Sequence, residues 1–134
     1  MATKFRELTK AEEQLMQILW EKDKALVNDL LEDLPEPKPA YNTVSTVMRV
    51  LERKGFVSHK AYGKTHEYFP LMSKKEYTDQ SCKTLLKGYF SNSFEKMVSF
   101  FAIEKKLSLK EMEEIKHIME EEIKKNKIWK SWTE

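Results

Sequence analysis

One segment, residues 40–54, constrains the fold more than any other part of this chain. On a helical wheel it divides into an apolar face, made of Val44, Val47, Met48 and Leu51, and a polar face, made of Asn42, Thr46, Arg49 and Arg53 with Ser45 at its edge. Gly55 follows, where helices commonly end with a left-handed residue. The spacing therefore predicts a helix with one face in a core and the other exposed.

The flanking segments predict what packs around that helix. A capping box at Thr9 and Glu12 opens a predicted helix over 10–22, and a second helix is expected over 25–34, where the prolines of 35–39 stop it. Two strands are expected over 56–60 and 65–69, joined by a turn at 62–64 and ended by Pro70. Three short helices followed by a hairpin are the order of a winged helix-turn-helix.

The remainder of the chain reads as helical. Ser73 with Glu76 opens a helix that runs toward Gly88, and Ser108 with Glu111 opens an amphipathic helix that reaches Ile123, with apolar residues around 94–101 between them. We therefore predict a mostly α chain with a small β wing. It would hold a winged helix-turn-helix DNA-binding domain over 5–72, a helical dimerisation domain over 73–126 and a loosely ordered tail over 127–134.

Charge is spread unevenly along the chain. The formal net charge is only +2, yet residues 38–66 carry six basic and one acidic side chain, for +5. Residues 1–37 carry five basic and nine acidic side chains, for −4. The middle block is therefore the part suited to a polyanion, although an excess of charge on a solvated face is the simpler alternative.

The predicted helix over 40–54 suits the major groove of DNA. Short polar side chains let the backbone approach base edges, and arginine reads guanine or holds phosphate. The candidate base-contacting residues lie at its start: Tyr41, Asn42, Thr43, Ser45 and Thr46. The candidate phosphate contacts lie farther along and on the wing: Arg49, Arg53, Lys60, Tyr62 and Lys64. For Tyr62, packing on the hairpin is the competing interpretation.

The C-terminal segment carries more apolar residues than a few short helices bury alone, which indicates a homodimer. The candidate interface residues are Phe90, Phe94, Met97, Phe101, Leu107, Met112, Ile115 and Met119. The competing interpretation is packing within the chain against the N-terminal unit.

Several functional classes find no support in the sequence. We expect no membrane insertion, and residues 1–6 lack the apolar core of a signal peptide, so a cytoplasmic location is expected. Cys82 is the only cysteine, and we expect it to act as a small apolar side chain. His59 and His66 are candidate neighbours across the wing, but we expect them to face solvent or phosphate and not a metal. We expect no cofactor, no metal and no enzyme.

Two other functions remain open at this point. The first is a winged-helix module that binds proteins and never meets DNA, which the concentration of positive charge disfavours. The second is a ligand-binding regulator that dimerises through a helix preceding the DNA-binding unit, which the early start of the first helix disfavours.

The segment from Pro39 to Val57, PAYNTVSTVMRVLERKGFV, resembles the penicillinase repressor family, the BlaI/MecI-type regulators with their copper-responsive CopY-type branch. The opening segment, residues 8–12 with Leu19 and Trp20, also resembles this family, as do the wing and the helix from Leu107 to Ile118. The resemblance covers about residues 5–125.

This resemblance implies a homodimer bound to a palindromic operator, repressing resistance or metal-handling genes. It places the recognition positions at Asn42, Thr43, Ser45 and Thr46. It also implies relief through a membrane-bound sensor metalloprotease that triggers cleavage of an Asn-Phe bond, a position that reads Phe100-Phe101 here. The paired Cys-x-Cys motifs of the copper branch are absent from this chain.

Overall fold

A computed structural model describes residues 7–104 and 107–133 of the chain, with side chains up to Lys127. Residues 5 and 6 of the predicted first domain and Glu134 of the predicted tail lie outside the described residues. The chain divides into two units, Met1–Lys83 and Thr84–Glu134. Unit 1 includes the first part of a helix that was predicted to belong to the second domain.

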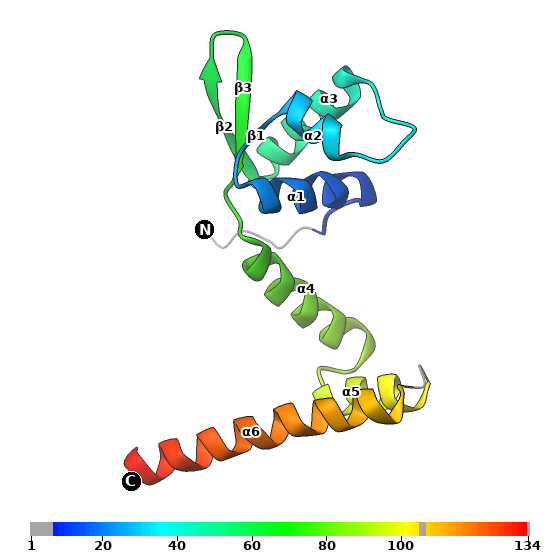
Figure 1. Ribbon diagram of the computed structural model, residues 1–134, viewed down its shortest axis with the longest axis vertical. Helices are drawn as coiled ribbons and strands as arrows, with labels where there is room; N and C mark the ends of the chain where they lie inside the picture. The colour runs from blue at the N-terminus through cyan, green and yellow to red at the C-terminus, as the bar shows by residue number, and fades with distance from the viewer. Residues whose placement is uncertain (1–6, 105–106, 134) are drawn as a thin grey trace. The chain divides into compact units, whose positions relative to one another are not determined.

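Unit 1 has the predicted winged-helix order (Figure 1). Its elements are α1 (Lys10–Lys22), β1 (Ala25–Leu26), α2 (Val27–Asp33), α3 (Tyr41–Arg53), β2 (Val57–Tyr62) and β3 (Thr65–Pro70), followed by the start of α4 (Lys74–Tyr89). The three strands form one antiparallel sheet in the order β1-β3-β2. The fold class predicted for this part of the chain is therefore confirmed.

The caps that the sequence predicts are present at the start of α1 and at the end of α3. At the start of α1 the Thr9 hydroxyl accepts from the Glu12 N–H at 3.2 Å, while the Glu12 carboxylate accepts from the Thr9 N–H at 2.8 Å. At the end of α3, Gly55 has φ +88, and the Phe56 N–H donates to the Leu51 carbonyl at 3.0 Å. This left-handed glycine turns the chain from α3 into the wing.

The second predicted helix begins two residues later than expected. Ala25 and Leu26 form strand β1, paired with Tyr68 and Glu67 of β3. The Leu26 N–H then donates to the Asp29 carboxylate at 3.0 Å, which satisfies a free group at the start of α2. The spacing of the apolar residues over 25–34 is compatible with either a helix or a strand at the start of this segment. Ala25 and Leu26 are extended because they pair with β3, which lies far away in the sequence.

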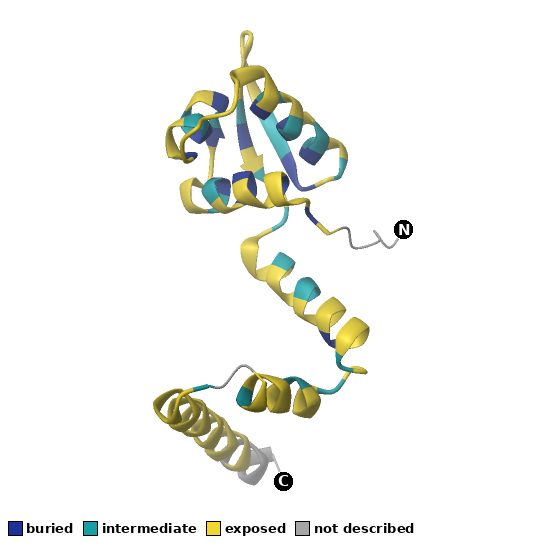
Figure 2. Ribbon diagram, turned by 90° about the vertical axis from the view of Figure 1, so that its right-hand side faces the viewer, coloured by how far each residue is buried: buried dark blue, intermediate teal, exposed yellow. Residues whose placement is uncertain are grey.

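The core of unit 1 lies between its helices and the sheet. Fourteen buried apolar residues form one cluster, contributed by the segment before α1, all three helices and the strands (Figure 2). The largest fully buried side chains include Met16, Leu19, Met48 and Tyr68. The start of α4 is attached to this core, because the Trp20 indole donates to the Met72 carbonyl at 2.9 Å and the Leu8 N–H donates to the Tyr77 hydroxyl at 3.0 Å.

Unit 2 contains the end of α4, then α5 (Phe94–Ile103) and α6 (Leu109–Thr133). Ser93 caps α5, and Ser108 with Glu111 caps α6, as the sequence predicts for the latter. Helix α6 continues to Thr133, whereas a loosely ordered tail was predicted over 127–134. No proline or glycine interrupts residues 124–133, so the backbone can continue as helix after the apolar pattern ends.

Candidate nucleic-acid interface

Helix α3 has the two faces that the sequence predicts. Val44, Met48 and Leu51 are buried in the core of unit 1, and Val47 is half-buried. The residues of the opposite face lie in solvent: Asn42, Thr43, Thr46, Arg49 and Arg53 are exposed, and Ser45 is half-buried. Tyr41, at the first turn, is 49% exposed. The packing of α3 therefore directs its polar face outward and leaves its start accessible.

Two hydrogen bonds order the exposed face of α3. The Thr46 hydroxyl donates to the Asn42 carbonyl at 2.8 Å, and an Arg49 guanidinium nitrogen donates to the Ser45 hydroxyl at 3.5 Å. Thr46 has thus used its one hydroxyl proton within the helix, and its oxygen can still accept a hydrogen bond from a base or water. The side-chain amide of Asn42 keeps both donor and acceptor groups for a base edge.

The far end of α3 is held by an ion pair. The Lys54 ammonium lies 2.9 Å and 2.8 Å from the two carboxylate oxygens of Glu12, a residue that is only 3% exposed. Burial of the Glu12 carboxyl opposes its ionisation, but Lys54 and the groups of Thr9 outweigh burial and lower the pKa below its ordinary value. This pair joins the first turn of α1 to the last turn of α3.

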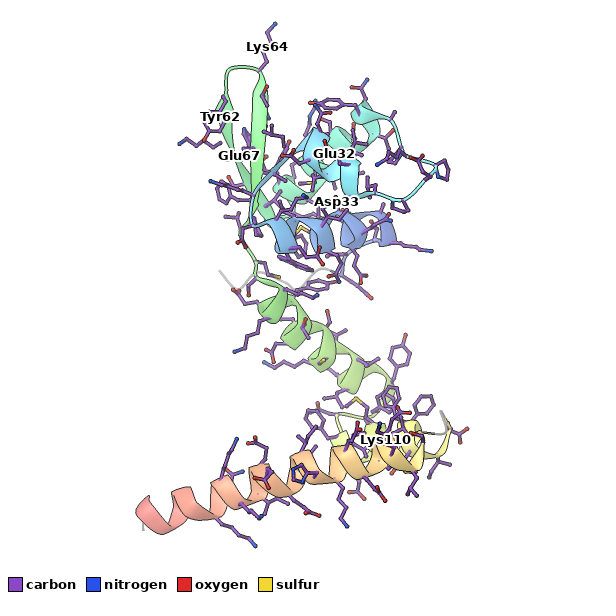
Figure 3. All side chains as sticks on the ribbon, viewed as in Figure 1. Glu32, Asp33, Tyr62, Lys64, Glu67 and Lys110 are labelled. Atoms are coloured by element: carbon purple, nitrogen blue, oxygen red, sulfur yellow. The ribbon has the colours of Figure 1, made fainter. Side chains whose placement is uncertain are left out.

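The strand register separates the predicted wing residues into two faces. Lys60 is paired with Glu67 and Tyr62 with Thr65, so all four lie on one face of the hairpin. There the Lys60 ammonium lies 5.4 Å from the centre of the Tyr62 ring. Lys64 extends from the tip of the hairpin (Figure 3). The structure therefore places Lys60 and Tyr62 on the wing but not on the face that looks toward α3.

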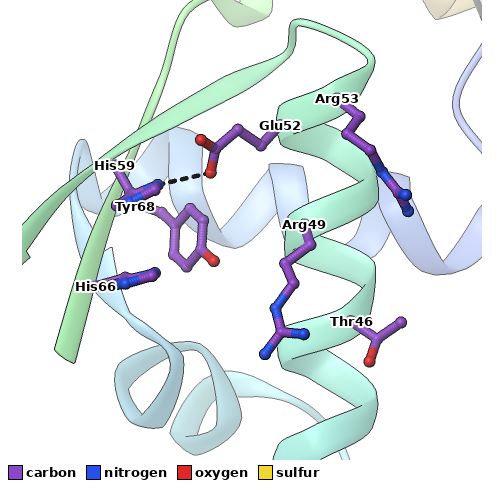
Figure 4. Close-up of a pocket in the computed structure, with 7 residues that line it drawn as sticks. All are labelled: Thr46, Arg49, Glu52, Arg53, His59, His66 and Tyr68. Carbon is purple, nitrogen blue, oxygen red and sulfur yellow. Dashed lines mark hydrogen bonds and ion pairs between the residues drawn. The ribbon is translucent and has the colours of Figure 1, made fainter. Parts of the chain in front are cut away.

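The opposite face of the hairpin carries two histidines that meet α3 across a groove (Figure 4). The groove has a volume of about 690 Å³ and is lined by Thr46, Arg49, Glu52, Arg53, His59, His66 and Tyr68. The rings of His59 and His66 stack with their centres 4.0 Å apart and an angle of 11° between their planes. His59 Nδ1 lies 2.7 Å from a carboxylate oxygen of Glu52.

The sequence made these histidines candidate neighbours across the wing that face solvent or phosphate. The structure places them side by side, with His66 exposed and His59 half-buried against Glu52. The strand register brings them together. His59 is paired with Tyr68, and Ala61 with His66, so the two histidines are diagonal neighbours on one face. The buried Tyr68 lies on the same face, and burial, then the Glu52 carboxylate, raise the pKa of its hydroxyl.

A winged helix that exposes a polar, basic helix beside a wing is matched by one family model, that of the penicillinase repressor, over residues 8–121. The chain belongs to the penicillinase repressor family. Members of this family are transcriptional repressors with a winged-helix DNA-binding domain, and not enzymes.

Curated members of the family are similar over nearly their whole length. The methicillin resistance regulatory protein MecI of Staphylococcus aureus strain N315 is 28% identical over 120 residues, covering 89% of this chain and 98% of MecI. The penicillinase repressor of Bacillus licheniformis is 24% identical over 119 residues, covering 88% of this chain and 93% of that repressor. The penicillinase repressor of Staphylococcus aureus is 28% identical over 128 residues, covering 93% of this chain and all of that repressor.

Solved structures of the family were also matched. The solution structure of the DNA-binding domain of the repressor BlaI aligns with a TM-score of 0.49 at 22% identity, covering 57% of this chain and 94% of that domain. The monomeric form of Bacillus licheniformis BlaI in complex with the blaP half-operator aligns with a TM-score of 0.46 at 23% identity, covering 55% and 92% of the two chains.

In this family member the predicted dimer-interface residues all lie in unit 2. Phe94, Phe101, Met112, Ile115 and Met119 are exposed in the single chain. Phe90, Met97 and Leu107 are half-buried, and the Phe90 ring lies 5.6 Å from that of Phe100. Within the described part of the chain, no group of three His, Cys, Asp or Glu side chains could hold a metal ion, and none of the helices is long and apolar enough to cross a membrane.

Proposed function

We propose that this repressor binds a palindromic operator as a homodimer and thereby blocks transcription. The observation that carries the proposal is the exposed polar and basic face of α3, which lies beside a basic wing and is supported by a buried apolar face. A repressor of this kind acts where the chromosome lies, so the proposed location is the cytoplasm.

Within this proposal the two ends of α3 have different tasks. Asn42, Thr43, Ser45 and Thr46, with Tyr41 beside them, contact bases, since the start of a recognition helix enters the major groove. Arg49 and Arg53 on α3, with Lys60, Tyr62 and Lys64 on the wing, contact the sugar-phosphate backbone. Such contacts position the protein and supply affinity that depends on salt.

The proposed dimer rests on the apolar surface of unit 2. Met112, Ile115 and Met119 lie on one side of α6, and all three are exposed in the single chain. A two-fold dimer would cover the same patch on both chains and present two copies of α3 to DNA. Two equivalent copies of α3 would bind two equivalent half-sites, which is why the operator in this proposal is a palindrome.

The test is a competition titration against operator and scrambled duplex at one fixed salt concentration. Alanine at both Asn42 and Thr46 removes two base contacts, each worth roughly 1–3 kcal/mol of discrimination. We expect the ratio of specific to nonspecific affinity to collapse while nonspecific binding stays nearly unchanged. The matched control replaces Asn126 and Thr84, which are exposed in unit 2, by alanine. A wild-type ratio in the Asn42 and Thr46 variant would refute the assignment of base contacts to α3.

The competing function is a winged-helix module that binds proteins. It predicts no salt-sensitive binding to any duplex, whereas residues 38–66 carry a net charge of +5 that favours a polyanion. Absence of duplex binding at low salt would therefore favour the competing function.

The regulated genes and the inducing signal are proposed by similarity. The relatives include a methicillin resistance regulatory protein and penicillinase repressors, so we propose that this chain controls resistance or stress genes. Relief by a membrane-bound sensor metalloprotease pathway would act near Phe100-Phe101, which lies in α5 with both residues exposed. Appearance of a fragment cut at this bond after induction would support that route, and an intact chain under full induction would exclude it.

A further inference from the structure

The groove between α3 and the wing holds a cluster of titratable groups that the proposed DNA contacts do not use. His59 on β2 and His66 on β3 stack at 4.0 Å, and His59 is tied to Glu52 of α3 at 2.7 Å. His66 is exposed, whereas His59 is half-buried. The stack thus has an anchored ring and an outer ring that faces the groove.

The other charged and titratable groups around this stack come from two elements. Helix α3 contributes Arg49 and Arg53 to the groove in addition to Glu52, and β3 contributes the Tyr68 hydroxyl. The Tyr68 ring lies 5.7 Å from the ring of His59 and 6.3 Å from that of His66. Tyr41, at the start of α3, is also close enough to influence Tyr68 electrostatically.

The groove around His66 is rich in positive charge. Arg49 and Arg53 of α3 line the same groove. The Glu52 carboxylate holds the His59 ring, and the His66 ring stacks on it at 4.0 Å. His66 is therefore held beside two arginines with its ring exposed to the groove.

This groove suits an anion. A DNA phosphate bound beside Arg49 and Arg53 would favour a proton on the neighbouring His66 ring, because the charged ring can then donate a hydrogen bond to it. The groove lies between the exposed face of α3 and the face of the hairpin turned toward it, which is where the duplex backbone passes if α3 enters the major groove (Figure 4).

We propose that His66 is a phosphate-binding residue of the DNA interface, positioned by His59 and Glu52, and that it takes up a proton when the duplex binds. This inference rests on the proposed function, since it names a further contact of the same interface. It adds a wing contact on the face that Lys60 and Tyr62 do not occupy.

A proton taken up on binding makes the complex more stable at lower pH. Uptake of about one proton makes binding up to about tenfold tighter for each unit by which the pH falls. The protonated ring adds one phosphate contact, which steepens the dependence of log affinity on log salt by about one unit.

The experiment measures the affinity of the full-length protein for a nonspecific duplex between pH 6 and pH 8, at several salt concentrations. Wild type should bind more tightly and with a steeper salt dependence at pH 6. His66→Gln should bind with the pH 8 affinity and the shallower salt dependence throughout. His66→Lys, which keeps its charge, should bind tightly across the range without the pH dependence. Calorimetry in two buffers of different ionisation enthalpy should show uptake of at most about one proton by wild type.

The control is His117→Gln, because His117 is the third histidine of the chain and is exposed on α6 in unit 2. It should keep the full pH dependence. Glu52→Gln tests the positioning role. Removing the carboxylate that holds the His59 ring should weaken the pH dependence that His66 provides.

The outcomes separate the two proposals. Wild type that fails to bind duplex at any pH would refute the proposed function itself. Wild type that binds equally at pH 6 and pH 8, or a His66→Gln variant that keeps the wild-type pH dependence, would overturn the role of His66 alone. Loss of the pH dependence in His117→Gln would also overturn it.

Discussion

The two units of this chain treat their apolar residues in opposite ways. Unit 1 encloses fourteen of them in one core, whereas Leu86 is the one buried apolar residue in the described part of unit 2 (Figure 2). Helices α5 and α6 carry Phe94, Ile103, Leu109 and Ile118 at exposures of 59% or more. Soluble monomers rarely leave so much apolar surface uncovered. Unit 1 therefore has an apolar core of its own, and the exposed apolar surface of unit 2 is the basis of the proposed dimer.

The ion pairs show the same contrast. In unit 1, Glu12 and Lys54 join α1 to α3 in a buried setting. In unit 2 the pairs on α6, such as Lys116 with Glu120, link neighbouring turns of one helix and are exposed. Exposed pairs of this kind contribute little to stability. Charges therefore fix tertiary structure in unit 1 and mainly keep the surface of unit 2 hydrated.

The largest effect is expected in the core of unit 1. Leu51→Ala removes a fully buried side chain from the inner face of α3 and should lower the free energy of unfolding by about 2–5 kcal/mol. Chemical denaturation followed by circular dichroism measures this loss. The matched change in unit 2, Leu109→Ala at an exposed position, should cost far less. Equal losses would remove the contrast between the two units.

The next effect concerns the surface of unit 2. Ile115→Lys combined with Met119→Lys places two charges on the proposed interface and should weaken dimerisation about 100-fold, since the few residues that dominate an interface contribute about 2 kcal/mol or more each. Sedimentation should then show the mass of one chain at micromolar concentration, where wild type shows twice that mass. Glu114→Lys, on the far side of α6, is the control and should remain dimeric. A wild type that sediments as a monomer would contradict the dimer.

A smaller effect is expected from the buried ion pair. Glu12→Gln removes the charge that Lys54 contacts and should cost about 1.5–3 kcal/mol of unfolding free energy at neutral pH. Because the folded-state pKa of Glu12 lies below its ordinary value of 4.5, its contribution is complete above that value and is lost as the pH falls through the folded-state pKa.

The difference in stability between wild type and Glu12→Gln should accordingly shrink in acid, as measured by denaturation at pH 7 and below pH 4. Glu120→Gln in unit 2 should cause no measurable change at either pH. A Glu12→Gln difference that stayed constant with pH would contradict the role given to this pair.

The smallest effect separates DNA contacts from surface charge. Arg49→Ala and Lys64→Ala should each weaken binding to all duplexes and lower the slope of log affinity against log salt by about one unit. Lys116→Ala in unit 2 should leave the slope unchanged. A drop in affinity confined to the cognate site, with the slope unchanged, would exclude the phosphate contacts.

Much of unit 1 could be predicted from the sequence because its signals are local. The Thr9 and Glu12 capping box, the two faces of α3 and the left-handed Gly55 each depend on residues within a few positions of one another. Strand β1 could not be predicted in this way, since Ala25 is extended only because Tyr68 lies opposite it.

The two faces of α3, one apolar and one polar and basic, could be read from the sequence, since helical periodicity assigns every residue to a face. Which wing residues share the groove with the polar face depends on how the two strands pair. The register of β2 and β3 places His59 and His66 on the face toward α3. It places Lys60 and Tyr62 on the opposite face. Glu52 of α3 contacts His59. Side chains alternate along a strand, so the pairing of β2 with β3 decides which face of the hairpin each side chain lies on. The composition of the two strands is compatible with either face.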